Sequence, residues 1–226
     1  MEYVELARAE TERGELVLRE RRPHDGPTAL ELRANGVFVM DTLEVSTERT
    51  LASAALALVD HPGAVVVGGL GLGYTMHEVL SDHRVELCAV VEIEEALVGW
   101  MRDGTIHHGP ALLADARVRI VVADIAVALT EAHPASYDLI LLDVDNGPGY
   151  LVHEGNAALY EEPLLEAARQ VLRPGGALAV WSSDESPALA AALEAVFGNV
   201  EIQPLHVELQ GRDEHYWLFA ARLAET

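Results

Sequence analysis

The alternation of apolar and polar positions divides the chain near residue 50 into two parts. Four segments of the first part alternate with a period of two: residues 3–9, 15–21, 29–33 and 37–40. That period is typical of strands that bury one face. Arg13-Gly14 separates the first pair of segments and Asn35-Gly36 the second, and Asn-Gly is the strongest short hairpin signal. We therefore expect residues 1–50 to form a small N-terminal antiparallel β-domain of two hairpins.

From residue 51 to residue 226, short apolar runs alternate with segments of helical spacing. The predicted helices cover residues 50–59, 74–81, 94–102, 125–131, 157–172 and 187–197. The predicted strands begin near Ala64, Val85, Val118, Tyr137 and Ala177. Residues 200–208 and 215–222 are expected to form a closing antiparallel pair, and residues 107–110 a loop. This order predicts an α/β domain with a Rossmann-like, mostly parallel sheet.

A glycine-rich turn follows the first strand of this second part. The β-branched run at residues 64–67 leads into Gly69, Gly71 and Gly73, and a helix begins at Tyr74. A strand, a glycine turn and a helix start together form a nucleoside pocket, because bare backbone lets a ligand approach closely. The spacing is G-x-G-x-G, which lacks the longer spacing that cradles a dinucleotide pyrophosphate.

Acidic residues end the next two predicted strands. Glu92 lies about twenty residues after the glycines, where a carboxylate can accept hydrogen bonds from both ribose hydroxyls of a nucleoside. Asp124 ends the third strand and is placed to meet an adenine amino group. Glycines and two acids at three successive strand ends fit S-adenosylmethionine (AdoMet) better than a dinucleotide. A nicotinamide-dependent oxidoreductase is therefore a distant alternative.

Charge and composition narrow the choice of partners and compartment. The formal net charge is −22, from 15 basic residues, all arginine, and 37 acidic residues. This field disfavours nucleic acid and anionic membranes and attracts a cationic substrate, unless it only aids solubility. The chain has one cysteine, Cys88, within a predicted strand, and we see no signal peptide and no apolar run that could span a bilayer. We expect a soluble cytoplasmic protein.

Several motifs resemble those of the spermidine synthase (polyamine aminopropyltransferase) family, which has the class I AdoMet-dependent methyltransferase fold. They lie at residues 35–37 with 45–49, 66–69, 90–93, 115–118 with 123–124, 137–143 and 159–160. The resemblance covers most of the chain. It implies a homodimer, a ribose-binding role for Glu92, and an active site at the strand ends.

Three departures from the family pattern bear on the reaction. Gly71 stands where aminopropyltransferases have an aspartate that meets the aminopropyl end of decarboxylated AdoMet. Asn146 stands where they have a proton-accepting aspartate, and an amide cannot take a proton from an ammonium group at neutral pH. Apolar residues 51–55 replace a Y-H-E triplet. These losses argue against a working spermidine synthase and leave room for the carboxylate of AdoMet.

The fourth predicted strand and the segment after it supply candidates for catalysis. Asp143 ends the strand and is assigned to the site, where it also contacts the cofactor. Asp145 is the candidate base unless it only forms a turn, and His153 is a second candidate unless it is a surface residue of the predicted lid, residues 146–156. Three further residues are assigned to the acceptor pocket: Asn146, Tyr150 and Tyr160. Trp181 either walls that pocket or belongs to the core. No residue set has metal-ligand spacing.

The favoured interpretation is an AdoMet-dependent transferase, most simply a methyltransferase, that acts on a small cationic acceptor. The alternative in the same fold is an aminopropyltransferase that uses decarboxylated AdoMet and has Asp145 as its base. A third hypothesis, from a different class, is a non-catalytic protein that has kept the nucleoside pocket and lost turnover.

Overall fold

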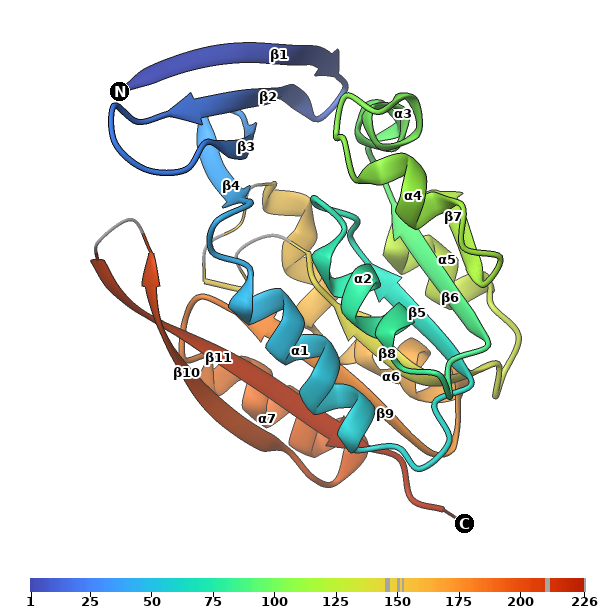
Figure 1. The fold of residues 1–226 in the computed structure, drawn as a ribbon. Helices are drawn as coiled ribbons and strands as arrows, with labels where there is room; N and C mark the ends of the chain where they lie inside the picture. The colour runs from blue at the N-terminus through green and yellow to red at the C-terminus, as the bar shows by residue number, and fades with distance from the viewer. Residues whose placement is uncertain (145–146, 150, 152, 210–211, 226) are drawn as a thin grey trace.

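The fold consists of two sheets, and the smaller one lies over one end of the larger one (Figure 1). The computed structural model describes residues 1–144, 147–149, 151, 153–209 and 212–225. The smaller sheet is antiparallel, in the order β1-β2-β3-β4. Its strands are β1 (Glu2–Thr11), β2 (Gly14–Arg22), β3 (Ala29–Ala34) and β4 (Val37–Asp41). The prediction of a small N-terminal antiparallel sheet is confirmed.

The turns of the two N-terminal hairpins are joined by hydrogen bonds. Asn35 and Gly36 both have positive φ, 51° and 75°, as the tight turn between β3 and β4 requires. The Asn35 side chain accepts a hydrogen bond from Glu15 N at 2.9 Å and donates one to Arg13 O at 3.1 Å. The β3–β4 turn therefore fixes the β1–β2 turn, which carries Arg13.

The larger sheet has seven strands in the order β10-β11-β9-β8-β5-β6-β7. They are β5 (Ala64–Gly68), β6 (Leu87–Glu92), β7 (Val118–Val122), β8 (Tyr137–Leu142), β9 (Leu172–Ser182), β10 (Glu201–Leu209) and β11 (Arg212–Arg222). The five strands β9, β8, β5, β6 and β7 are parallel. Strand β11 pairs antiparallel with β9 on one side and with β10 on the other. The predicted fold class is confirmed.

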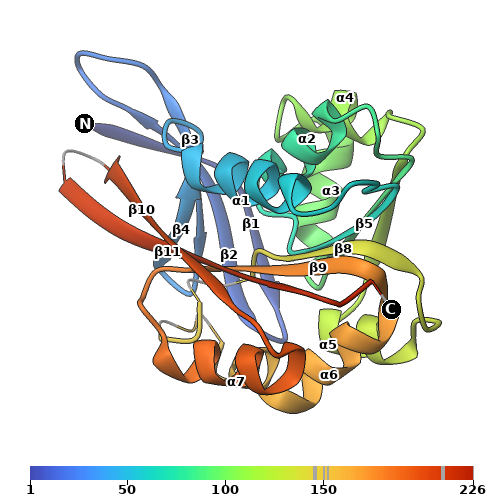
Figure 2. The ribbon, with the colours of Figure 1, turned by 90° about the horizontal axis from the view of Figure 1, so that it is seen from below.

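Helices cover both faces of this sheet (Figure 2). One face carries α1 (Ser46–Ala57), α2 (Tyr74–Ser81), α3 (Glu95–Asp103) and α4 (Gly109–Leu113). The other carries α5 (Ile125–Glu131), α6 (Glu162–Val171) and α7 (Pro187–Phe197). Two apolar clusters, one on each side of the sheet, form the core. In the described part of the chain, no helix is both long and apolar enough to cross a membrane.

Three local predictions were wrong. The helix predicted over residues 157–172 is two segments, a 3₁₀ helix η1 (Glu154–Tyr160) and α6, because Glu161 is extended and α6 begins at Glu162 with Pro163 in its first turn. Gly109 and Pro110, expected in a loop, instead begin the short helix α4. Finally, α1 begins at Ser46, four residues earlier than predicted, so Glu48 lies in its first turn.

Candidate functional site

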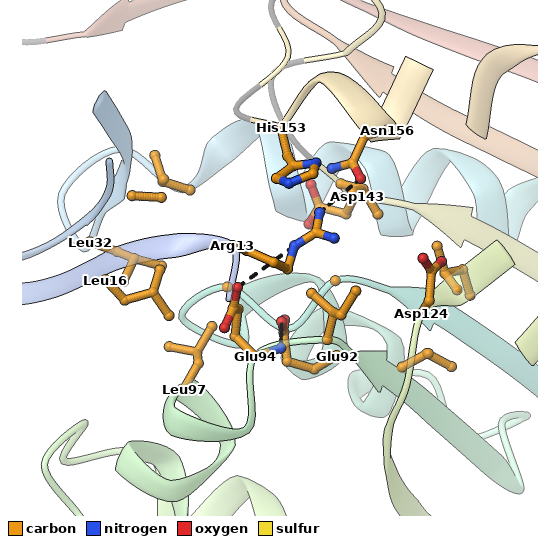
Figure 3. Close-up of a pocket in the computed structure, with 18 of the residues that line it drawn as sticks. Arg13, Leu16, Leu32, Glu92, Glu94, Leu97, Asp124, Asp143, His153 and Asn156 are labelled. Carbon is orange, nitrogen blue, oxygen red and sulfur yellow. Dashed lines mark hydrogen bonds and ion pairs between the residues drawn. The ribbon is translucent and has the colours of Figure 1, made fainter. Parts of the chain in front are cut away.

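A pocket lies between the smaller sheet and the carboxyl ends of the central strands of the larger sheet (Figure 3). The N-terminal sheet contributes Arg13, Leu16, Leu32 and Met40 to its lining, and α1 contributes Glu48. The strand ends contribute Gly69, Gly71, Glu92, Asp124, Asp143 and Trp181. In an open α/β sheet the ligand binds outside the carboxyl ends of the strands, which is where this pocket lies.

The first two glycines of the turn are needed for close approach. Gly69 has φ 93°, and a Cβ there would lie 2.2 Å from the Asp143 carbonyl oxygen. Gly71 has φ 49°, and a Cβ there would lie 2.8 Å from Met40 Sδ. Leu72 N donates a hydrogen bond to the same sulfur at 3.2 Å. Met40 of β4 therefore closes the space beside Gly71.

The third glycine of the turn does not line the pocket. Gly73 is the N-cap of α2 with φ 85°, and a Cβ there would lie 2.9 Å from Met101 Cε of α3. Its predicted cofactor contact finds no support in this geometry. Gly73 is needed to turn the chain into α2 and to let α3 pack against it.

Glu92 accepts hydrogen bonds from the backbone of the glycine turn and of the segment after β6. Its Oε2 accepts a hydrogen bond from Leu70 N and its Oε1 accepts one from Glu94 N, both at 2.8 Å. The residue is only 6% exposed, and burial raises the pKa of its carboxyl group although the backbone hydrogen bonds oppose that shift. Each carboxylate oxygen keeps acceptor capacity for a ribose hydroxyl. Its assignment to the ribose remains a prediction.

Asp124 lines the neighbouring part of the pocket and caps α5. Its side chain accepts a hydrogen bond from Ala126 N at 2.8 Å. The cap fixes the carboxylate at the end of β7, the position expected for a group that meets an adenine amino group. That contact also remains a prediction.

The opposite part of the pocket contains a pair of carboxyl groups, Glu48 and Asp143. Thr47 Oγ1 donates a hydrogen bond to Glu48 Oε2 at 2.8 Å, and Thr75 Oγ1 donates one to Asp143 Oδ2 at 2.5 Å. Burial, together with the negative charge of Asp143, raises the pKa of Glu48 to about 7. Burial raises the pKa of Asp143 to about 6, although the hydrogen bond from Thr75 opposes that shift. Both groups therefore titrate near neutral pH.

Comparison with known proteins assigns the chain to a family. Residues 44–194, two thirds of the chain, match the family model described as "Spermine/spermidine synthase domain". The chain belongs to the spermine/spermidine synthase family. The family predicted from the motifs is thereby confirmed.

Two curated relatives of this family member are informative. Polyamine aminopropyltransferase 2 of Pseudomonas aeruginosa is 33% identical over 161 residues, which are 66% of this chain and 44% of that protein. Putrescine N-methyltransferase 3 of Nicotiana tabacum is 32% identical over 123 residues, 54% of this chain and 30% of that protein. The chain thus matches less than half of the length of either relative.

Solved structures confirm the fold. The spermidine synthase from Thermotoga maritima superposes with a TM-score of 0.82 over 98% of this chain and 74% of its own, at 16% identity. Human methyltransferase-like protein 13, in complex with SAH, superposes with a TM-score of 0.58 over 78% of this chain and 82% of its own, at 22% identity. Both the synthase and the methyltransferase share the architecture described above.

The remaining site predictions for this family member have mixed outcomes. His153 lines the pocket, and its Nδ1 accepts a hydrogen bond from Gly155 N at 3.2 Å, which caps η1. Tyr160, expected in the acceptor pocket, is instead buried against α6, and its hydroxyl donates to Val144 O at 2.7 Å. The predicted residues Asp145, Asn146 and Tyr150 lie outside the described residues.

Arg13 is a pocket residue for which no role was predicted. From the β1–β2 turn its Nη2 donates to Asn156 Oδ1 at 2.9 Å, and its Nε lies 3.8 Å from Glu94 Oε1 (Figure 3). The arginine thus bridges the pocket between Glu94, the N-cap of α3, and Asn156 in η1. Nothing local in the sequence signals this bridge, because its partners are separated from Arg13 by many residues.

Trp181 near the end of β9 also lines the pocket. Its ring is stacked on Tyr216 of β11, with centroids 5.0 Å apart and planes inclined by 32°. Its Nε1–H is buried and has no hydrogen-bond partner among the residues that the structure describes. In the same part of the chain, no group of three or more His, Cys, Asp and Glu side chains is arranged to hold a metal ion.

Proposed function

We propose that the protein transfers an alkyl group from an S-adenosyl sulfonium donor to an amino group of a small diamine or polyamine. The observation that carries this proposal is the pocket itself. It has a close-approach glycine turn with acids at the next two strand ends, Glu92 and Asp124, and a carboxyl pair at its other end. The first part suits an adenosyl group, and the second suits a cation.

The reaction requires no covalent bond between the protein and the transferred group. An amine displaces the thioether in line from the carbon bound to the sulfonium sulfur, so the pocket has to align the two molecules and accept a proton from an ammonium group. The anionic field of the chain, −22 in formal charge, favours entry of a cationic acceptor.

Aminopropyl transfer from decarboxylated AdoMet is the better supported version of this reaction. The family model and the Pseudomonas relative both support it, and that relative aligns with a larger share of this chain than the methyltransferase does. The sequence favoured methyl transfer, so the order of the two hypotheses is reversed here.

Methyl transfer from AdoMet is the second candidate, because one observation favours it. No carboxylate stands at Gly71, and Met40 fills the adjacent space, so nothing at that position repels the carboxylate of AdoMet. The putrescine N-methyltransferases among the relatives support an acceptor of the same kind for this reaction.

A direct assay separates the candidates. The protein is incubated with putrescine and either donor, and the amine product is identified by mass spectrometry. An aminopropylated product formed only with decarboxylated AdoMet supports the first candidate, and a methylated product with AdoMet supports the second. Binding of a donor without any product would contradict both and favour a non-catalytic protein.

A further inference from the structure

The part of the pocket formed by α1, β8 and β9 holds charged and aromatic groups that the adenosyl assignment does not use. Glu48 projects from the first turn of α1 and Asp143 follows β8, so the two carboxyl groups come from elements far apart in the sequence. Each has one hydroxyl donor, Thr47 Oγ1 and Thr75 Oγ1 respectively. Two neighbouring carboxyl groups that share a partly enclosed space favour either a bound cation or a shared proton.

Trp181 adds an aromatic side chain to the lining of this end of the pocket. Trp181 lines the pocket and stacks on Tyr216, and the buried Nε1–H of Trp181 lacks an acceptor among the described residues. A buried donor without a partner is unfavourable and rare in folded proteins. A ring face next to carboxylates also suits an ammonium group. A carboxyl pair and an aromatic side chain in the lining of one pocket therefore suit a cationic ligand.

We propose that Glu48 is a catalytic residue that binds the acceptor's ammonium group together with Asp143 and takes its proton. This inference rests on the proposed transferase function. Glu48 would serve as the base, whose identity the sequence left open because Asn146 stands where the family has a proton-accepting aspartate. Glu48 lies within a segment, residues 45–49, that carries the family resemblance, yet its residue type alone gave no reason to assign it a role.

The proton and electron balance of the step is simple. The ammonium nitrogen gives a proton to a Glu48 carboxylate oxygen and becomes a neutral amine with a lone pair. That lone pair forms a bond to the carbon attached to the sulfonium sulfur, the carbon–sulfur bond breaks, and its electron pair stays on sulfur as a neutral thioether. The product nitrogen carries the positive charge, and Glu48 returns its proton to water.

The surroundings of Glu48 suit a base that works near neutral pH. Five titratable or charged groups interact with it or lie beside it: Asp143, Glu44, Arg49, Tyr74 and Tyr216. The pKa of Glu48, raised to about 7 by burial and by the charge of Asp143, lies close to the pH at which a general base is most effective. Arg49 points over the ring of Tyr74, at 5.9 Å from its centroid.

The first test measures protons and needs no turnover. Putrescine is titrated at pH 7 into protein saturated with S-adenosylhomocysteine or 5′-methylthioadenosine, in two buffers of different ionisation enthalpy. A diammonium ligand should displace the proton from Glu48, so wild-type protein is expected to release protons on binding. Glu48→Gln should abolish the release, and Glu44→Gln, which removes the same charge nearby, should keep it. Equal proton release by wild type and Glu48→Gln would overturn the proposal.

The second test measures turnover. Glu48→Gln is expected to lower kcat about 10²-fold or more and to flatten the rise in kcat between pH 6 and pH 8 (about one unit either side of the pKa), while Glu48→Asp restores part of the rate. Donor affinity, measured separately, should stay within about threefold of wild type, which also shows that the variant folds. If wild type transfers an alkyl group and Glu48→Gln does so almost as fast, this inference fails while the proposed function stands. If wild type binds no donor, the proposed function fails.

Discussion

Two glutamates, the buried Glu92 and the partly buried Glu48, mark the two ends of the pocket, and their surroundings differ. Glu92 accepts hydrogen bonds from two backbone N–H groups, Leu70 N and Glu94 N, and so holds the glycine turn in place. Glu48 has a single hydroxyl donor, from Thr47, and faces a second carboxyl group, that of Asp143. Both have raised pKa values, for which burial is the largest cause.

The difference shows how surroundings decide what a buried carboxylate can do. Backbone donors fix the position of Glu92 and favour its charged form, which suits a permanent acceptor for ribose hydroxyls. A neighbouring carboxyl group disfavours the charged form of Glu48, which suits a group that gains and loses a proton. Substitutions at either glutamate, at the turn between them and at the Arg13 bridge separate these contributions.

The largest effect is expected from Glu92→Ala. It removes the acceptor of two buried N–H groups, which should lower the free energy of unfolding by about 1–3 kcal/mol for each, and should weaken donor binding by about the same amount. Thermal unfolding and donor titration measure the two effects. Glu92→Gln, which keeps the shape and one acceptor, should lie between the variant and wild type. Unchanged donor affinity in Glu92→Ala would contradict the ribose assignment.

The next effect concerns stability and pH. Because the pKa of Glu48 is raised from 4.5 to about 7 in the folded state, the folded protein binds more protons than the unfolded chain between these values. Its contribution to stability is therefore complete below about pH 4 and is lost as the pH rises through 7, by on the order of 1–3 kcal/mol. Denaturant titrations across this pH range should show this loss of stability in wild type and in Glu44→Gln. Glu48→Gln should not show it. If the free energy of unfolding varied with pH equally in wild type and Glu48→Gln, the pKa of Glu48 would not be raised in the folded state.

A third effect, of about 1.4 kcal/mol or tenfold in affinity, concerns the donor's tail at the turn between the two ends. Gly71→Asp alone should destabilise the protein, because its φ is 49° and Met40 Sδ stands where the new Cβ would lie. Met40→Ala combined with Gly71→Asp should relieve the clash and shift the preference toward decarboxylated AdoMet, since an aspartate attracts the amine and repels the carboxylate. Competition binding measures the preference. No shift in a folded double variant would remove Gly71 from the determinants of donor choice.

The smallest effect is expected from Arg13→Ala. Arg13 bridges Glu94 and Asn156 across the pocket through a partly exposed ion pair and a hydrogen bond, so its loss should change donor affinity by about 1 kcal/mol or less. Arg8→Ala is the matched control, because Arg8 lies on the same hairpin and pairs with Glu5 and Glu15 instead. Equal effects of the two variants would show that the bridge contributes nothing to binding.

The adenosyl end of the pocket could be predicted from the sequence because its signals are local. Gly69, Glu92 and Asp124 lie at or just after the ends of β5, β6 and β7, and parallel strands bring their carboxyl ends to one edge. The paired turn of Asn35 and Gly36 was likewise readable from two residues. Fold class and most helix positions followed from the same periodicity.

Of the other end, the sequence predicted Asp143 but not the partner of this carboxyl group, since that partner comes from a distant segment. Glu48 became a pocket residue only because α1 starts at Ser46 and lies beside the end of β8. Met40 reaches Gly71 from a different sheet. Tyr160 was assigned to the acceptor pocket from its place in a motif, but the break between η1 and α6 turns it toward Val144.

The central claim is that this pocket binds an S-adenosyl donor through the Glu92 end. Isothermal titration of wild type, Glu92→Ala and Glu48→Gln with AdoMet, decarboxylated AdoMet and NAD tests it directly. We expect saturable binding of at least one sulfonium donor and no comparable binding of NAD. Donor affinity should be about fivefold or more lower in Glu92→Ala (about 1 kcal/mol or more) and nearly unchanged in Glu48→Gln. Absence of binding by both sulfonium donors, or tighter binding of NAD, would contradict it.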